Sequence, residues 1–209
     1  MSVAVREIET PGGPGRAHVS SRRHTRGTVV LSHGAGGGLG ALDLTLAVDV
    51  LTAHGWAVAL VEQPWLVAGR RIAGPPATLD AAWVPIVEAL LTGRARLPRP
   101  LVVGGRSAGA RVACRTAAAL EAAGGLLLSF PLHPPGRPDR LRADELALAP
   151  SPTVVVQGAK DPFGTPAELA AYVAPGTTVL EVPGAHSFPA SAGPLLRVAL
   201  ERAAGMLPG

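Results

Sequence analysis

The 209-residue sequence contains few cysteine, lysine and aromatic residues. Its single cysteine, Cys114, excludes an internal disulfide and a cysteine-based zinc cluster. Cys114 falls in an alanine-rich stretch with a helical pattern, where we expect it to pack as a small apolar residue. The single lysine, Lys160, lies far along the chain from the main glycine-rich segment, which excludes a nucleotide-triphosphate P-loop.

Long hydrophobic runs are also missing. No apolar stretch approaches the roughly eighteen residues of a membrane span. The opening segment, MSVAVREIET, carries acidic residues early and lacks the apolar core of a signal peptide. We therefore expect a cytoplasmic protein without a membrane partner. A hydrophobic content of 47% provides for a sizeable core, and the length predicts a single domain over residues 1–209.

The net charge of +4 comes almost entirely from arginines scattered along the chain. Only Ser20 to Arg26 forms a local basic cluster, and it has no interleaved aromatic residues, so we interpret it as a solvated loop. We expect no nucleic-acid partner. The sequence does not indicate an oligomeric state.

Short runs rich in valine and leucine alternate with longer alanine-rich helical patterns, which predicts an α/β fold. The expected architecture is a mostly parallel eight-stranded sheet with helices on both faces, with the first two strands as an antiparallel hairpin through TPGGPG (10–15). Strands are predicted at Val3–Glu9, Ala17–Ser20, Thr28–Ser32, Ala57–Val61, Leu101–Gly104, Gly125–Phe130, Thr153–Gln157 and Thr178–Val182. Helices are predicted at Asp43–Ala53, Leu79–Leu91, Ala108–Ala123, Pro166–Tyr172 and Ala192–Ala204.

A glycine-rich turn, LSHGAGGGLGAL (31–42), follows the third predicted strand and invites two interpretations. The first is dinucleotide binding, because Gly36-Gly37-Gly38-Leu39-Gly40-Ala41 matches G-x-G-x-x-A. Glu62 follows about twenty residues later, at the end of the next strand, where an acid that binds the ribose would lie. Four residues, 32–35, separate that match from the strand, whereas a dinucleotide turn begins almost at once. The second interpretation is an oxyanion-binding loop, which requires a nucleophile, a base and an acid at later strand ends.

Those three residues are present at the expected places. Ser107 lies in the G-x-S-x-G motif Gly105–Gly109, where a strand turns into a helix. Asp161 and His186 directly follow the seventh and eighth predicted strands. This is the Ser, Asp, His chain order of an α/β hydrolase, so we favour the oxyanion interpretation.

The segments GGRSAGARVACR (104–115), SHGAGG (32–37), FPLHPP (130–135) and GAHSF (184–188) resemble the small, lidless α/β hydrolases related to dienelactone hydrolase. More narrowly, the sequence is similar to the family of testis-expressed protein 30 and the third subunit of the nonspecific lethal complex. The resemblance implies an α/β-hydrolase fold with Ser107, Asp161 and His186 as the triad. The sequence departs from the family's pattern in two places. The loop after Gly36 is richer in glycine than usual, and Ala185 lies before the histidine at a position that is often polar in related hydrolases.

These residues predict a serine hydrolase, esterase-like, that forms an acyl-enzyme from a small acyl substrate. We expect the backbone N–H groups of Ala108 and Ala35 to bind the oxyanion. Candidate substrate contacts are His33, Arg106 and His133; for each a structural role is the alternative, which for Arg106 is an ion pair beneath the loop. No cofactor and no metal are expected.

The segment from Pro131 to Pro150 is only about twenty residues long, too short for the helical cap that many hydrolases insert there. The sequence does not separate ester, thioester, lactone and peptide substrates. A noncatalytic α/β-hydrolase domain that serves as a binding or scaffold module stays open as the main alternative, with the dinucleotide binder behind it.

Overall fold

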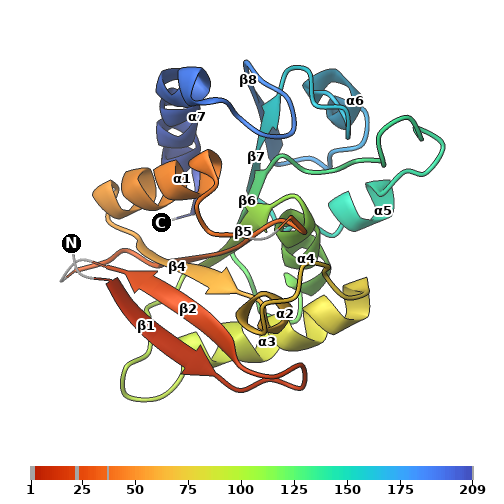
Figure 1. Ribbon diagram of the computed structural model, residues 1–209. Coiled ribbons are helices and arrows are strands. Elements are labelled where there is room, and N and C mark those ends of the chain that lie inside the picture. Colours follow the sequence, from red (N-terminus) through yellow and green to blue (C-terminus); the bar gives the residue numbers. More distant parts are fainter. Residues whose placement is uncertain (1–2, 22–23, 37, 209) are drawn as a thin grey trace.

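The computed structural model describes residues 3–21, 24–36 and 38–208 of the protein. One eight-stranded sheet runs through them in the order β1-β2-β4-β3-β5-β6-β7-β8 (Figure 1). The strands are β1 Val3–Ile8, β2 Gly15–Ser20, β3 Thr28–Ser32, β4 Ala57–Glu62, β5 Leu101–Arg106, β6 Gly124–Leu128, β7 Thr153–Gly158 and β8 Thr177–Val182. The helices are α1 Leu42–Ala53, α2 Pro64–Val67, α3 Pro76–Leu91, α4 Ala108–Thr116, α5 Ala143–Leu146, α6 Pro166–Ala170 and α7 Gly193–Met206, preceded by the 3₁₀ turn η1 Ala190–Ala192.

The sheet is mixed. Strands β3 to β8 are parallel to one another, whereas β2 pairs antiparallel with both β1 and β4. This confirms the predicted hairpin and the predicted strands, whose bounds shift by one or two residues. Continuous apolar runs form the central strands because both faces there are covered, while the edge strand β1 is largely exposed.

Helices cover both faces of the sheet, as predicted. Helices α1 and α7 pack together on one face, and α3 and α4 pack together on the other (Figure 1). Each face has its own apolar core: Trp56 is fully buried beneath the α1 and α7 side, and Trp83 and Phe130 are fully buried on the α3 and α4 side. The parallel strands therefore deliver their carboxyl ends to one edge, where α/β proteins place their sites.

Two helix predictions were too long. Helix α4 ends at Thr116 instead of Ala123: the Ala117 N–H bonds three residues back, to the carbonyl of Cys114 (3.5 Å), and the next five residues form turns that end at Glu121 with φ 50°. Helix α6 ends at Ala170 instead of Tyr172, and the one-turn helices α2 and α5 were not predicted.

The segment between β6 and β7 contains only the one-turn helix α5, so the fold has no cap over the sheet edge.

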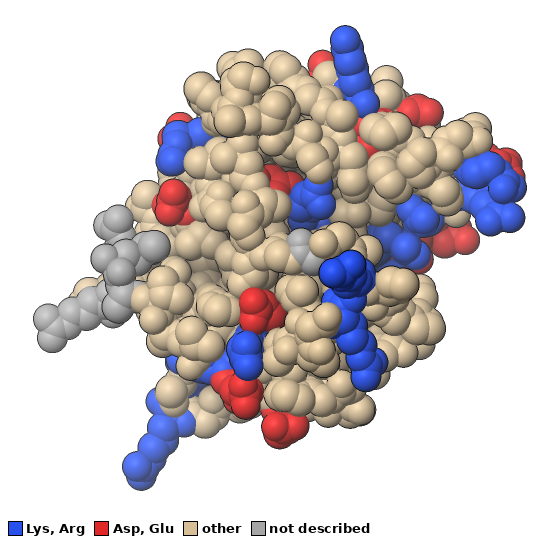
Figure 2. Space-filling view, viewed as in Figure 1, with Lys and Arg blue, Asp and Glu red and all other residues tan. Residues whose placement is uncertain are grey.

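On the face shown in Figure 2, blue basic side chains are separated by tan surface and mixed with red acidic ones. Among the described residues, no helix combines the length and apolar character needed to cross a bilayer.

Candidate active site

Ser107 lies in a strained turn between β5 and α4. Its backbone has φ 53° and ψ −109°, a conformation with positive φ that non-glycine residues rarely adopt. Its neighbours have no room for a side chain: a Cβ on Gly105 would overlap the backbone of Ser32, and one on Gly109 would lie 2.5 Å from the Ser32 carbonyl oxygen. The two glycines therefore let α4 and β3 close around the turn, which holds Ser107 at the end of the sheet.

Ser107, His186 and Asp161 form one chain of hydrogen bonds. His186 Nε2 lies 2.9 Å from Ser107 Oγ, and His186 Nδ1 lies 2.9 Å from Asp161 Oδ2. Since an ionised carboxylate can only accept, Nδ1 carries the proton of a neutral His186 and Nε2 is left to accept from the Ser107 hydroxyl. The loops after β5, β7 and β8 thus bring together three residues that are 25 and 79 positions apart.

Asp161 is almost completely buried, and its carboxylate is held from two sides. The Phe163 N–H donates to Oδ1 (2.8 Å), and the Gln157 Nε2 donates to Oδ2 (3.0 Å). Gln157 also donates to the carbonyl of Gly164 (2.7 Å), which anchors the loop that carries the acid. Sequence reasoning missed Gln157; the available signal was one polar residue at the end of the valine strand TVVVQG.

The loop that carries His186 is held by Phe163 and Arg106. The Phe163 ring packs on the imidazole with a centroid distance of 4.1 Å. The Arg106 guanidinium donates to the His186 carbonyl (2.8 Å) and to Ser187 Oγ (2.7 Å), and its Nε lies 3.2 Å from Asp43 Oδ2. Burial raises the pKa of Asp43, while the neighbouring Arg106 charge lowers it. These are the contacts of a structural ion pair beneath the loop, the alternative to a substrate contact.

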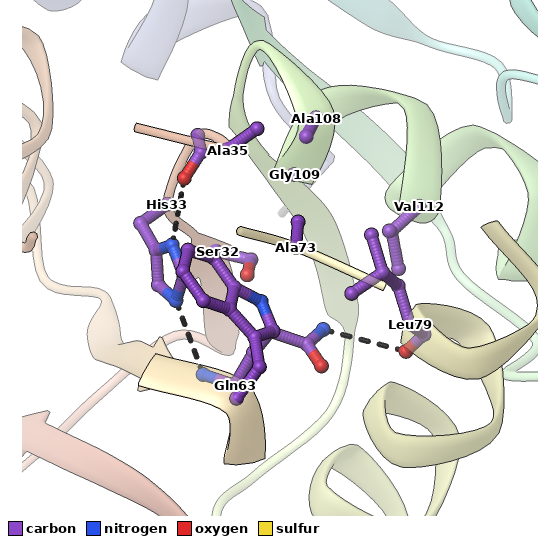
Figure 3. Close-up of a pocket in the computed structure, with 11 residues that line it drawn as sticks. Ser32, His33, Ala35, Gln63, Ala73, Leu79, Ala108, Gly109 and Val112 are labelled. Carbon is purple, nitrogen blue, oxygen red and sulfur yellow. Dashed lines mark hydrogen bonds between the residues drawn. The ribbon is translucent and has the colours of Figure 1, made fainter. Parts of the chain in front are cut away.

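Ala35 and Ala108, the two expected oxyanion residues, line the same small cavity (Figure 3). The Ala108 N–H belongs to the first turn of α4, whose amide groups have no carbonyl partner within the helix. The preceding loop residue, Gly34, packs so closely on the strand-to-helix turn at Gly105–Gly109, here called the elbow, that a Cβ there would lie 3.4 Å from the Ser107 Cβ. The two main-chain segments therefore meet beside Ser107.

His33 ties this loop to the segment after β4. Its Nδ1 lies 2.9 Å from the Gly34 carbonyl, and its Nε2 accepts from the Gln63 N–H at 3.1 Å (Figure 3). The ring also meets Trp65 edge-on, with a centroid distance of 5.2 Å. Burial lowers the pKa of His33. A neutral ring with the proton on Nδ1 satisfies both bonds, so His33 holds the loop in place.

His133 and Glu62 have other partners. The His133 ring is buried, with Nδ1 3.0 Å from the Pro134 carbonyl and Nε2 3.5 Å from Glu168, away from the cavity beside Ala108. Glu62, expected to bind ribose in the dinucleotide interpretation, has its carboxylate 3.4 Å from His18 Nε2. Gly37 of that fingerprint lies outside the described residues. Nowhere in the described parts of the chain do three His, Cys, Asp or Glu side chains gather as metal ligands would.

Comparisons with known proteins identify the family and the fold. The model of the alpha/beta hydrolase domain family matches residues 25–193. Among solved structures, the lidless serine hydrolase XC6422 from Xanthomonas campestris superposes with a TM-score of 0.78 at 20% identity, over 100% of this chain and 97% of that one.

Two further structures superpose over nearly all of the chain. Dienelactone hydrolase from Anabaena variabilis gives a TM-score of 0.77 at 16% identity, over 100% of this chain and 99% of that one. Est1E from Butyrivibrio proteoclasticus gives 0.74 at 13% identity, over 97% and 98%. No curated protein matches the sequence. These structures establish the fold, and the family match establishes that the chain belongs to the alpha/beta hydrolase domain family.

Proposed function

We propose that the protein is a serine hydrolase that cleaves small acyl esters through an acyl-enzyme. The observation that carries this proposal is the hydrogen-bonded chain from Ser107 Oγ through His186 to Asp161, with both bonds at 2.9 Å. A serine hydroxyl at its ordinary pKa is a weak nucleophile and requires a base within hydrogen-bond reach. His186 is that base, and Asp161 holds its tautomer.

The proposed reaction has two halves. Ser107 Oγ attacks the acyl carbon while its proton passes to His186 Nε2, and the alcohol then leaves with that proton. Water next attacks the acyl-enzyme and gives its proton to His186, and the collapse of the second intermediate returns the proton to Ser107 and releases the acid. The N–H groups of Ala108 and Ala35 bind the oxyanion in both halves; one such donor typically contributes about 3 kcal/mol to lowering the barrier.

The relatives support this class of reaction. XC6422 is a serine hydrolase without a lid, and the Anabaena protein is a dienelactone hydrolase. The narrower likeness to the testis-expressed protein 30 family rests on the run Gly104–Arg115 and is part of the same proposal. The short segment between β6 and β7 leaves the site uncapped, which suits small or extended acyl substrates rather than deeply enclosed ones.

A fluorophosphonate probe tests the proposal on the purified protein, with the modified residue located by mass spectrometry. We expect labelling at Ser107, none in Ser107→Ala, and strongly reduced labelling in His186→Ala. The matched control is Ser191→Ala, which removes an exposed hydroxyl of the 3₁₀ turn η1 and should keep the labelling of Ser107.

The outcome that contradicts the proposal is a well-folded protein that no probe labels at neutral or mildly alkaline pH. That result would leave the noncatalytic binding or scaffold interpretation, in which Ser107 has no activated hydroxyl. Capture of a stable partner would then be the next measurement.

A further inference from the structure

The cavity next to the two oxyanion residues is very small. It has a volume of about 10 Å³ and lies between the loop after β3 and the first turns of α4, with Ala35 and Ala108 on its wall (Figure 3). A volume of roughly 10–15 Å³ on this measure holds a single water molecule. The cavity therefore has room for one methyl group and for little more.

Its position suits the acyl side of a substrate. The leaving oxygen has to lie next to His186, because His186 protonates it. With the oxyanion directed at the N–H groups of Ala35 and Ala108, the acyl substituent points away from the histidine. The wall of the cavity includes Ala108 and Gly109, the two residues that follow Ser107, whereas the described residues that line it do not include Ser107, His186 or Phe163. A cavity beside the oxyanion residues that does not touch the histidine suits the acyl substituent.

A larger cavity lies behind the small one. It has a volume of about 140 Å³ and is lined on its outer side by Arg70, Ile72 and Thr78. That volume is close to the roughly 150 Å³ of an apolar cavity that accommodates benzene. Three residues line both cavities, and they form the partition between them: Gln63, Trp65 and Leu79.

The partition is held firmly. The Gln63 N–H donates to His33 Nε2 (3.1 Å), and the Gln63 amide nitrogen lies 3.4 Å from the Leu79 carbonyl (Figure 3). Trp65 packs against His33, and both Trp65 and Leu79 are buried in the core on the α3 side of the sheet. An acyl chain that extends from the small cavity toward the larger one would have to displace these side chains, and close-packed interiors resist such displacement.

We propose that the enzyme is selective for acetyl and comparably short acyl esters, and that Gln63, Trp65 and Leu79 set this limit by closing the acyl site. The inference rests on the proposed function, because it assigns the acyl side of that same active site. It makes Leu79 a specificity-determining residue: removing its side chain joins the small cavity to the one of about 140 Å³ behind it.

The test measures kcat/KM for the acetyl, butyryl and hexanoyl esters of 4-nitrophenol, which share one leaving group. A single methylene in a closed pocket changes kcat/KM by roughly 10- to 200-fold. We expect the wild-type enzyme to prefer the acetyl over the hexanoyl ester by at least about tenfold on that scale. In Leu79→Ala the hexanoyl-to-acetyl ratio should rise by at least about tenfold, because the longer chain reaches the outer cavity.

Leu90→Ala is the matched control: Leu90 is a fully buried leucine of the same helix that lines neither cavity, so its ratio should equal that of the wild type. If Leu79→Ala does not fold, Trp65→Leu opens the same partition and carries the same expectation. Circular dichroism and thermal unfolding establish that each variant is folded.

Two results overturn the inference alone: a wild-type enzyme labelled at Ser107 that hydrolyses the hexanoyl ester as well as the acetyl ester, or folded partition variants with an unchanged chain-length ratio. Either would assign the small cavity to a buried water and place the acyl chain elsewhere. A protein that hydrolyses none of the esters and is not labelled at Ser107 overturns the proposed function, and this inference with it.

Discussion

The Arg106–Asp43 ion pair gives the most discriminating prediction on how the His186 loop is held in position. Arg106 bridges Asp43, at the start of α1, to the carbonyl of His186, and the Asp43 side chain is 2% exposed. The perturbation is Arg106→Met, which keeps the length of the side chain and removes the guanidinium. It leaves the Asp43 carboxylate buried without its charge partner and the His186 loop without two hydrogen bonds.

The expected loss is large. Breaking a buried ion pair from one side typically costs about 3–5 kcal/mol, because the remaining charge stays buried. In a chain of this size about 1 kcal/mol shifts Tm by roughly 2–4 °C, so we expect Tm to fall by about 10 °C. Burial raises the pKa of Asp43 in the folded state, and without Arg106 it rises further. The folded variant then binds a proton more readily than the unfolded chain, so its stability deficit grows as pH increases above the ordinary pKa of Asp43 and shrinks in acid.

The assay is thermal and urea unfolding of the wild type, Arg106→Met, Asp43→Asn and the double variant at pH 5 and pH 8, together with kcat/KM. The double variant has no buried charge, so it should recover at least half of the lost stability. Its activity should stay about 10- to 100-fold low, because the His186 loop is still unanchored. A loss below about 1 kcal/mol in Arg106→Met would refute the burial argument. Full return of activity in the double variant would refute the positioning role.

Two further predictions follow from the loop after β3 and from the elbow. Because burial lowers the pKa of His33, the unfolded chain takes up a proton first as the pH falls below about 7, so the stability of the folded protein should decrease toward pH 5. In His33→Asn this part of the slope of Tm against pH should disappear. Equal slopes for the two proteins would contradict the assignment of a lowered pKa to His33. Gly109→Ala places a methyl group 2.5 Å from the Ser32 carbonyl oxygen and should lower Tm and abolish probe labelling of Ser107, whereas Gly205→Ala, with open space around it in α7, should raise stability by up to about 1 kcal/mol. A stable, labelled Gly109→Ala protein would show that the elbow tolerates a side chain.

Several parts of the fold were predictable because they depend on local patterns. Valine-rich runs such as Thr28–Ser32 and Thr153–Gly158 alternate with amphipathic segments, and that alternation indicates a parallel sheet wherever it occurs. The hairpin of β1 and β2 was predictable from its glycine- and proline-rich turn. The end of α4 was not, because the alanine-rich sequence continues past Thr116 while the backbone turns there, with the Ala117 N–H bonded to the carbonyl of Cys114.

The candidate site also has a part that was predictable from the sequence and a part that was not. The chain order of Ser107, Asp161 and His186 was readable, since parallel strands bring their carboxyl ends to one edge and each residue lies within a few residues of a strand end. The partners of these residues were not readable. Gln157 donates a hydrogen bond to Asp161, four positions later, and Arg106 donates one to the carbonyl of His186, 80 positions later. Nothing in the local sequence of Gln157 or Arg106 specifies that partner.

The sequence by itself thus determined the hydrolase fold and the order of the three proposed catalytic residues. Periodicity and strand ends are properties of short segments, so one sequence contains them in full. Only the tertiary structure decided that Arg106 contacts the His186 loop, and that Gln63, Trp65 and Leu79 line both the small cavity beside Ala108 and the larger one. Those arrangements depend on the directions of side chains from segments distant in the chain, which become defined only when the core packs.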